Sequence, residues 1–70
     1  MKRVPISTEY VTLGQFLKLT DVIQSGGEAK AFLLEHRVFV NGEEDNRRGR
    51  KLYSGTIVEI DSQRFQITKI

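Results

Sequence analysis

"VFVNG", residues 38–42, joins a short alternating apolar strand to Asn-Gly, the dipeptide that most strongly favours a tight hairpin turn. Downstream, residues 56–60 alternate between apolar and polar side chains, which is the pattern of a strand with one buried face. Asp61-Ser62 then favours a second turn, and residues 64–70 continue the alternation. From residue 38 onward the sequence therefore predicts a run of antiparallel strands.

Two helices are predicted before this run, and each begins with a capping box. "TLGQ" (residues 12–15) and "SGGE" (residues 25–28) both place a hydroxyl side chain three residues before a Gln or Glu. The first helix is expected from residue 13 to 21 and the second from residue 26 to 36, each with an apolar stripe at helical spacing. Val22 and Ile23 do not fit the first stripe, so we place them in the connection.

The segment before the helices, residues 4–11, is expected to form an edge strand, because Pro5 has no backbone N–H to donate to a neighbouring strand. The resulting order is β-α-α-β-β-β, with two adjacent helices packed on a small, mainly antiparallel sheet. We therefore predict one α+β domain over residues 1–70. Its predicted core combines apolar residues of the helices and the strands: Phe16, Leu17, Phe32, Leu33, Val40, Val58, Ile60 and Phe65.

Composition argues against several function classes. The chain has no cysteine, and its single histidine, His36, cannot build a zinc site alone. His36 falls on the apolar face of the second predicted helix, where we expect it to pack or to cap the helix end rather than to act as a catalytic base. Glu43, Glu44 and Asp45 are interpreted as a solvated acidic turn rather than a magnesium site. We therefore predict a protein without catalysis, metal, cofactor or small-molecule substrate.

Signals for membrane insertion or export are not found in the sequence. The longest apolar run, residues 31–34, is far shorter than the roughly 20 residues that span a bilayer. The first ten residues lack the apolar stretch of a signal peptide. The absence of cysteine is typical of a reducing compartment. A soluble cytoplasmic protein without a membrane partner is the expectation.

"NRRGRK", residues 46–51, contains the whole net positive charge of the chain. The sequence has 11 Lys and Arg against 9 Asp and Glu, a net charge of +2. Without the four cations of this segment the count becomes 7 against 9, or −2. Such a segment binds phosphates through local contacts, or it is an ordinary surface loop neutralised by the acidic residues 43–45. On charge alone both interpretations stay open.

The predicted helices offer further cationic groups. At about 100° per residue, Lys30 and Arg37 project to nearly the same side of the second helix. Lys18 lies nearly opposite the apolar stripe of the first helix. The amides of Gly26 and Gly27 lie in a first helical turn without side chains, where a phosphate can approach them closely. The alternative is that these two glycines simply allow the turn between the helices.

Four motifs, in this order, resemble the S4 RNA-binding domain: "LGQFLK" (residues 13–18), "SGGEAK" (25–30), "VFVNG" (38–42) and "GTIV" (55–58). The stretch "NGE…NRRGRKL" is more narrowly similar to the small stand-alone S4 proteins of bacteria, the YaaA/YbcJ-like group. Two positions depart from the family pattern. Gly26 stands where the second helix usually has an arginine, and Gly55-Thr56 replaces the usual Gly-Asp.

The resemblance implies an S4-type αL RNA-binding fold with structured RNA as its partner, such as ribosomal RNA, an assembly intermediate or a tRNA-like fold. No aromatic residue lies among residues 46–51, Tyr53 being the nearest. We therefore expect folded or double-stranded RNA rather than single strands stacked on aromatic rings. The expected RNA-binding groups are the basic segment, the helix cations and two glycine amides: Arg47, Arg48, Arg50, Lys51, Lys18, Lys30, Arg37, Gly26 and Gly27.

Residues 46–51 are further expected to be solvated and to contribute little to folding, since they contain no apolar side chain. The protein is expected to act as a monomer. A different class of function stays open, namely a small protein–protein adaptor that docks on an acidic partner with the same segment. The two classes differ in salt dependence, because RNA affinity falls steeply and log-linearly with salt concentration.

Overall fold

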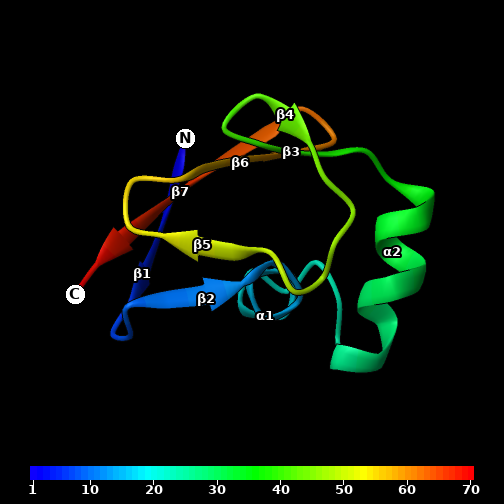
Figure 1. Cartoon of the computed structure of the whole chain (residues 1–70), viewed down its shortest axis with the longest axis horizontal. Helices are drawn as coiled ribbons and strands as arrows, with labels where there is room; N and C mark the ends of the chain where they lie inside the picture. Colours follow the sequence, from blue (N-terminus) through cyan, green and yellow to red (C-terminus); the bar gives the residue numbers. More distant parts are fainter.

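The computed structural model describes all 70 residues and confirms the predicted α+β class. Figure 1 shows strands along the top and left of the molecule, α1 below them and α2 at the right-hand end. No helix is long and apolar enough to cross a membrane. The elements, in chain order, are β1 (Lys2–Ile6), β2 (Tyr10–Thr12), α1 (Leu13–Leu19), a 3-10 turn η1 (Gly26–Glu28), α2 (Ala29–Glu35), β3 (Val38–Val40), β4 (Glu43–Glu44), β5 (Lys51–Tyr53), β6 (Ile57–Ile60) and β7 (Gln63–Lys69).

The main sheet has five strands in the order β1-β7-β6-β3-β4, and only the β1–β7 pair is parallel. Pro5 lies on edge strand β1, as its missing N–H requires. The prediction of one strand over residues 4–11 is wrong. The chain leaves the main sheet after Ile6, turns at residues 7–9, and pairs β2 with β5 in a separate two-stranded ribbon. Ile6 and Val11 are therefore both buried, but in different sheets.

Both predicted hairpin turns are confirmed by their backbone angles. Asn41 and Gly42 have φ of 50° and 86°, and Asp61 and Ser62 have φ of 47° and 72°. Positive φ at both central residues is the geometry that fits the right-handed twist of a two-residue hairpin. The acidic residues after the first turn are not a solvated turn, however. Residues 43–44 form β4 on β3, and the amide of Asp45 donates to the carbonyl of Val38 (2.9 Å).

Helix α1 begins with the predicted capping box. The Thr12 amide donates to Gln15 Oε1 (2.9 Å), and the Gln15 amide donates to the Thr12 hydroxyl (3.2 Å). The helix ends at Leu19, two residues earlier than expected, and Asp21 takes a positive φ of 60° just beyond it. Val22 and Ile23 lie in the connection, as predicted, and Ile23 reaches the core.

The second helix is shorter than the predicted residues 26–36. Its first turn is the 3-10 turn η1, because two successive glycines are poor α-helix formers. The Glu28 carboxylate reaches back to accept from the amides of Gln24 (2.7 Å) and Ser25 (2.9 Å). His36 has extended backbone angles, φ −122° and ψ 146°, so α2 ends at Glu35.

The core lies between α1 and the sheets, where the edge of Phe16 meets the face of Phe65 with ring centroids 5.4 Å apart. All predicted core residues are buried except Phe32, which is half-buried and stacks on His36 at a centroid distance of 4.1 Å. His36 packs on this ring and caps α2 as expected, because its amide donates to the Phe32 carbonyl (2.9 Å), and its Nδ1 lies 2.9 Å from the exposed Asp61 carboxylate. The core also contains apolar residues outside that list, of which Leu13 and Ala29 lie on the predicted helix stripes: Ile6, Val11, Leu13, Ile23, Ala29, Val38, Leu52 and Ile67.

Candidate nucleic-acid interface

The segment between β4 and β5 is an ordered loop that caps helix α1. Figure 1 shows it descending from the sheet to the start of α1. The carbonyls of Arg50 and Arg48 accept from the amides of Leu13 (2.8 Å) and Gly14 (2.9 Å). Amides in a first helical turn have no partner inside the helix, so this loop supplies acceptors that the helix lacks. We call residues 46–51, which are residues of this loop together with Lys51 at the start of β5, the basic loop.

Gly14 permits this close approach. A Cβ at this position would lie 3.3 Å from the Cβ of Arg48 and 3.4 Å from its carbonyl oxygen, tighter than ordinary van der Waals contact. It would also lie 3.7 Å from the Cβ of Ala29. The basic loop, α1 and α2 therefore converge at Gly14. In the sequence, this glycine stands out only as an interior position of the capping box.

Asp45 holds two arginines of the basic loop. Its carboxylate, only 6% exposed, accepts from Arg47 Nε (3.1 Å) and a terminal nitrogen of the same guanidinium (2.8 Å), and from Arg50 (2.8 Å). The Arg47 amide donates to it as well (2.9 Å). The hydrogen bonds from Arg47 outweigh the opposing effect of burial and hold the pKa of Asp45 well below its usual range. The same bonds raise the pKa of Arg47.

The basic loop is therefore divided between structural and free cations. Arg47 is solvated as expected, with 69% of its side chain exposed, whereas Arg50 is half-buried, and both bind a buried carboxylate. Arg48 and Lys51 are exposed and have no acidic partner. A phosphate meets no competing carboxylate at these two side chains.

Two exposed tyrosines lie beside Lys51. In the β2–β5 ribbon, Tyr10 pairs with Tyr53, and their ring centroids are 5.7 Å apart. The Lys51 ammonium lies 5.0 Å from the centroid of the Tyr10 ring. The basic loop contains no aromatic residue along the chain, but in space two aromatic rings lie next to it. The alternation of Lys51, buried Leu52 and Tyr53 is the signal that places Lys51 and Tyr53 on one face.

The helix cations lie apart from one another. Lys30 is exposed on α2, but Arg37 lies beyond the end of that helix, so the predicted shared basic edge is wrong. Arg37 Nε instead faces Glu44 Oε2 at 3.4 Å, with its guanidinium 5.3 Å from the Phe39 ring centroid. Lys18 lies in the last turn of α1, exposed and without an acidic partner.

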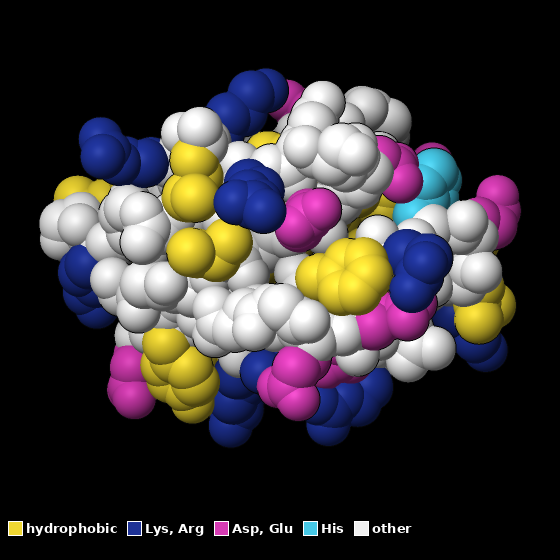
Figure 2. All heavy atoms as spheres, turned by 90° about the horizontal axis from the view of Figure 1, so that it is seen from above, with side chains coloured by type: hydrophobic (Ala, Val, Ile, Leu, Met, Phe, Trp, Pro, Cys, Tyr) yellow, Lys and Arg dark blue, Asp and Glu magenta, His cyan; other side chains and the backbone are white.

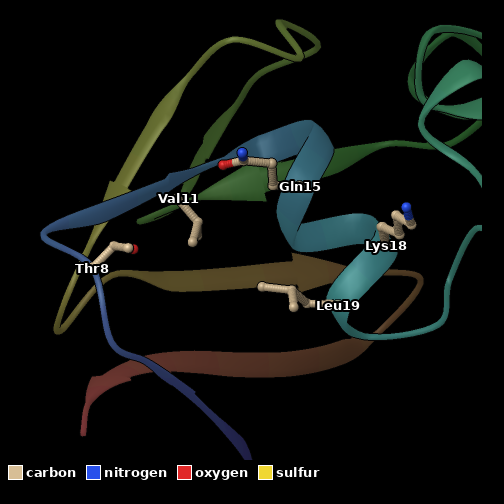
Figure 3. A pocket seen from close by; sticks show the side chains of 5 residues that line it. All are labelled: Thr8, Val11, Gln15, Lys18 and Leu19. Atoms are coloured by element: carbon tan, nitrogen blue, oxygen red, sulfur yellow. The ribbon is translucent and has the colours of Figure 1, made fainter.

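Lys18 borders an open groove of about 580 Å³ between β2 and α1. Figure 3 shows Val11 and Leu19 pointing toward each other across this groove, while Lys18 points away from it. Thr8 and Gln15 complete the lining. Lys18 is the one cation of this groove, and it lies at the margin. The groove is therefore mainly apolar and is not part of the basic surface.

Gly26 and Gly27 are exposed in η1. Neither amide is a donor among the turns, loops and caps of the protein. Neither residue has a positive φ, and a Cβ at Gly26 would meet no atom within 4 Å. The backbone does not need glycine here for a left-handed turn or a close contact, and the two amides have no acceptor among these turns, loops and caps.

Positive and negative groups are mixed on the side of the molecule formed by β3, β4 and β6. Figure 2 views the molecule from this side and shows both dark blue and magenta groups on it. Arg37 pairs with Glu44 there, and Arg64 Nε lies 3.5 Å from Glu59 Oε1. No group of three or more His, Asp or Glu is placed to hold a metal ion.

Comparison with known proteins fits this arrangement. A family model described as the S4 domain matches residues 4–68. The chain belongs to the S4 domain family. It is also 71% identical over 58 residues to a protein of Bacillus subtilis (strain 168) named "Probable ribosome maturation protein RlbA", a match that covers 83% of this chain and 82% of that protein. The resemblance to small bacterial S4 proteins noted in the sequence is confirmed.

Proposed function

We propose that this S4 domain protein binds structured RNA through the phosphate backbone, without catalysis, during ribosome maturation. Membership of the S4 family and similarity to a probable ribosome maturation protein support this role. The observation that carries it is the basic loop, where Arg48 and Lys51 are exposed and unpaired on a backbone fixed at the start of α1.

In this proposal the two kinds of cation act differently. Arg48 and Lys51 contact phosphates, and the planar guanidinium of Arg48 suits a two-oxygen contact. Arg47 and Arg50 hold the loop in shape through Asp45. Arg47 still exposes 69% of its side chain, so its outer edge adds positive potential at the same surface. Because the loop is ordered before RNA arrives, binding avoids much of the entropy cost of fixing it.

The remaining predicted residues extend this surface to different degrees. Lys30 and the amides of Gly26 and Gly27 extend it along α2, and Lys18 extends it along α1. Arg37 is the weakest member of the proposed set, since it already faces Glu44. That ion pair is exposed and worth at most about 1 kcal/mol, so a phosphate can compete for Arg37.

Ribosomal RNA is the proposed partner, in a folded or double-stranded form. The name of the B. subtilis relative refers to ribosome maturation, and maturing ribosomes offer densely folded RNA. Most of the proposed contacts reach phosphates, which position a protein on RNA without reading its sequence. We therefore expect recognition by shape and backbone, with little sequence discrimination in paired regions.

The salt dependence of RNA affinity tests this function. Folded fragments of ribosomal RNA are titrated at several salt concentrations with the wild type and with an Arg48→Gln/Lys51→Gln variant. The variant is expected to bind RNA roughly tenfold more weakly, because it loses two phosphate contacts. Its log-log salt slope is expected to fall by about 2, because each substitution leaves one phosphate without its cation.

A Lys2→Gln/Arg3→Gln variant is the matched control. It removes the same charge from edge strand β1, where both side chains are exposed and unpaired. Its RNA affinity is expected to stay close to that of the wild type. If both variants lose the same RNA affinity, the affinity depends on the total charge of the protein and not on the position of the cations. If the RNA affinity of the wild type does not change with salt concentration, the result contradicts phosphate binding and favours the adaptor alternative.

A further inference from the structure

We propose that Tyr10 and Tyr53 form a stacking platform for one unpaired base of the bound RNA. This rests on the proposed RNA-binding function and adds a subsite to it, one for a nucleotide that is bulged or looped out of a folded RNA. The platform would lie next to the phosphate contacts of the basic loop, on the ribbon that continues the loop into β5.

The two rings are the exposed aromatic surface of the protein. Tyr10 is 37% and Tyr53 45% exposed, whereas the four phenylalanines are buried or half-buried. The pairing of β2 with β5 sets the rings side by side, tilted at 51° with centroids 5.7 Å apart. Neither hydroxyl takes part in a hydrogen bond within the chain. A cross-strand aromatic pair stabilises a ribbon, but that role does not require both rings to face solvent.

The charges around the pair select a nucleotide as the occupant. The Lys51 ammonium lies over the Tyr10 ring, 5.0 Å from its centroid, which leaves Tyr53 as the more open ring. A base stacked on Tyr53 would place its phosphate within the field of Lys51, which has no acidic partner. An apolar peptide would use the rings but not the charge. The π-face of a base and the negative charge of its phosphate use both.

Tyrosine fluorescence tests the platform directly, because the chain contains two tyrosines and no tryptophan. The probes are two RNA hairpins with the same stem, one fully paired and one with a single bulged adenosine. The bulged hairpin is expected to bind roughly tenfold more tightly than the paired one, within the range of base–aromatic stacking. It is also expected to quench tyrosine emission, whereas the paired hairpin leaves the emission nearly unchanged.

A Tyr53→Leu variant is expected to lose the preference for the bulge and to keep its affinity for the paired hairpin. Tyr53→Phe retains the ring and is expected to retain the preference, which separates stacking from a role of the hydroxyl. Thermal melting of both variants verifies that they fold. If Tyr53→Leu does not fold, the preference and the quenching measured on the wild type decide the question by themselves.

Three outcomes overturn the platform. If the wild type binds the two hairpins with equal affinity and its tyrosine emission is unchanged, the platform does not exist, but the proposed phosphate binding is not affected. Failure of both hairpins to bind removes the proposed function as well. If Tyr53→Leu binds both hairpins as the wild type does but no longer associates with ribosomal particles, the tyrosines dock on a protein and the base subsite is wrong.

Discussion

The four cations of the basic loop lie within five positions of the chain but fall into two pairs. We call the pair bound to Asp45 the inner side and the unpaired pair the outer side. The inner side, Arg47 and Arg50, binds the buried carboxylate of Asp45. The outer side, Arg48 and Lys51, is exposed and unpaired. One acidic residue thus decides which cations shape the loop and which are free for a ligand. Local charge density alone does not distinguish a binding residue from a structural one.

The largest effect on stability is expected from Asp45→Asn, which removes the charge that holds the inner side. Charge-assisted hydrogen bonds from two arginines are weakened at a buried position, at a cost of about 2 kcal/mol. For a domain of this size such a loss lowers the melting temperature by roughly 8–16 °C. Differential scanning calorimetry at neutral pH measures the change.

Glu43→Gln is the control for Asp45→Asn. Glu43 lies two residues away on β4, is exposed, and takes part in no ion pair. Its substitution is expected to change stability by less than about 0.5 kcal/mol. Similar melting temperatures for the two variants would mean that the inner side contributes nothing to the fold.

Lowering the pH should remove part of the stability that the ionised Asp45 carboxylate contributes. A carboxyl whose pKa falls on folding stabilises the native state at pH values above its unfolded pKa of about 3.9. That stabilisation is lost as the pH falls through the lower folded pKa. The difference in free energy of unfolding between the wild type and Asp45→Asn should be constant above about pH 5 and shrink toward pH 2. Urea denaturation at a series of pH values tests this, and a difference that does not shrink contradicts it.

A smaller effect on stability is expected at Gly14, where α1 packs against the backbone of the basic loop. Gly14→Ala improves helix propensity by up to about 1 kcal/mol but crowds Arg48, so the net change in stability should stay below that value. Because the crowding displaces Arg48, RNA affinity should fall, though less than in Arg48→Gln/Lys51→Gln. Gly49→Ala is the matched control, since a Cβ there meets no atom within 4 Å. Equal RNA affinities for the two alanine variants would contradict a tight fit at Gly14.

Local signals in the sequence predicted the turns, the start of α1 and most of the core. Asn41-Gly42 and Thr12–Gln15 act through their own backbone and side chains, so their structure follows from a few adjacent residues. The break between β1 and β2 did not follow, because each strand is defined by its partner: β7 for β1 and β5 for β2.

The sequence identified the basic segment of the candidate site but not the side chains that surround it in space. Residues 46–51 were identified from charge, whereas the role of Asp45 depends on its burial against β3, which no local pattern reveals. Tyr10 and Tyr53 are 43 residues apart in the sequence and meet only through the β2–β5 pairing. Arg37 was misplaced because its helical projection continued one residue beyond the predicted helix end at His36, whereas α2 ends at Glu35. For Asp45 and for the two tyrosines, a contact between separate elements decided the outcome.

A cross-comparison of two double variants tests the division of the basic loop most directly. Arg47→Gln/Arg50→Gln and Arg48→Gln/Lys51→Gln each remove two positive charges from the same six residues. Melting temperature and affinity for a folded ribosomal RNA fragment are measured for both. The inner variant should lower the melting temperature clearly, and the outer variant should leave it unchanged while weakening RNA binding roughly tenfold. Two variants that lose the same stability and the same affinity would contradict the division.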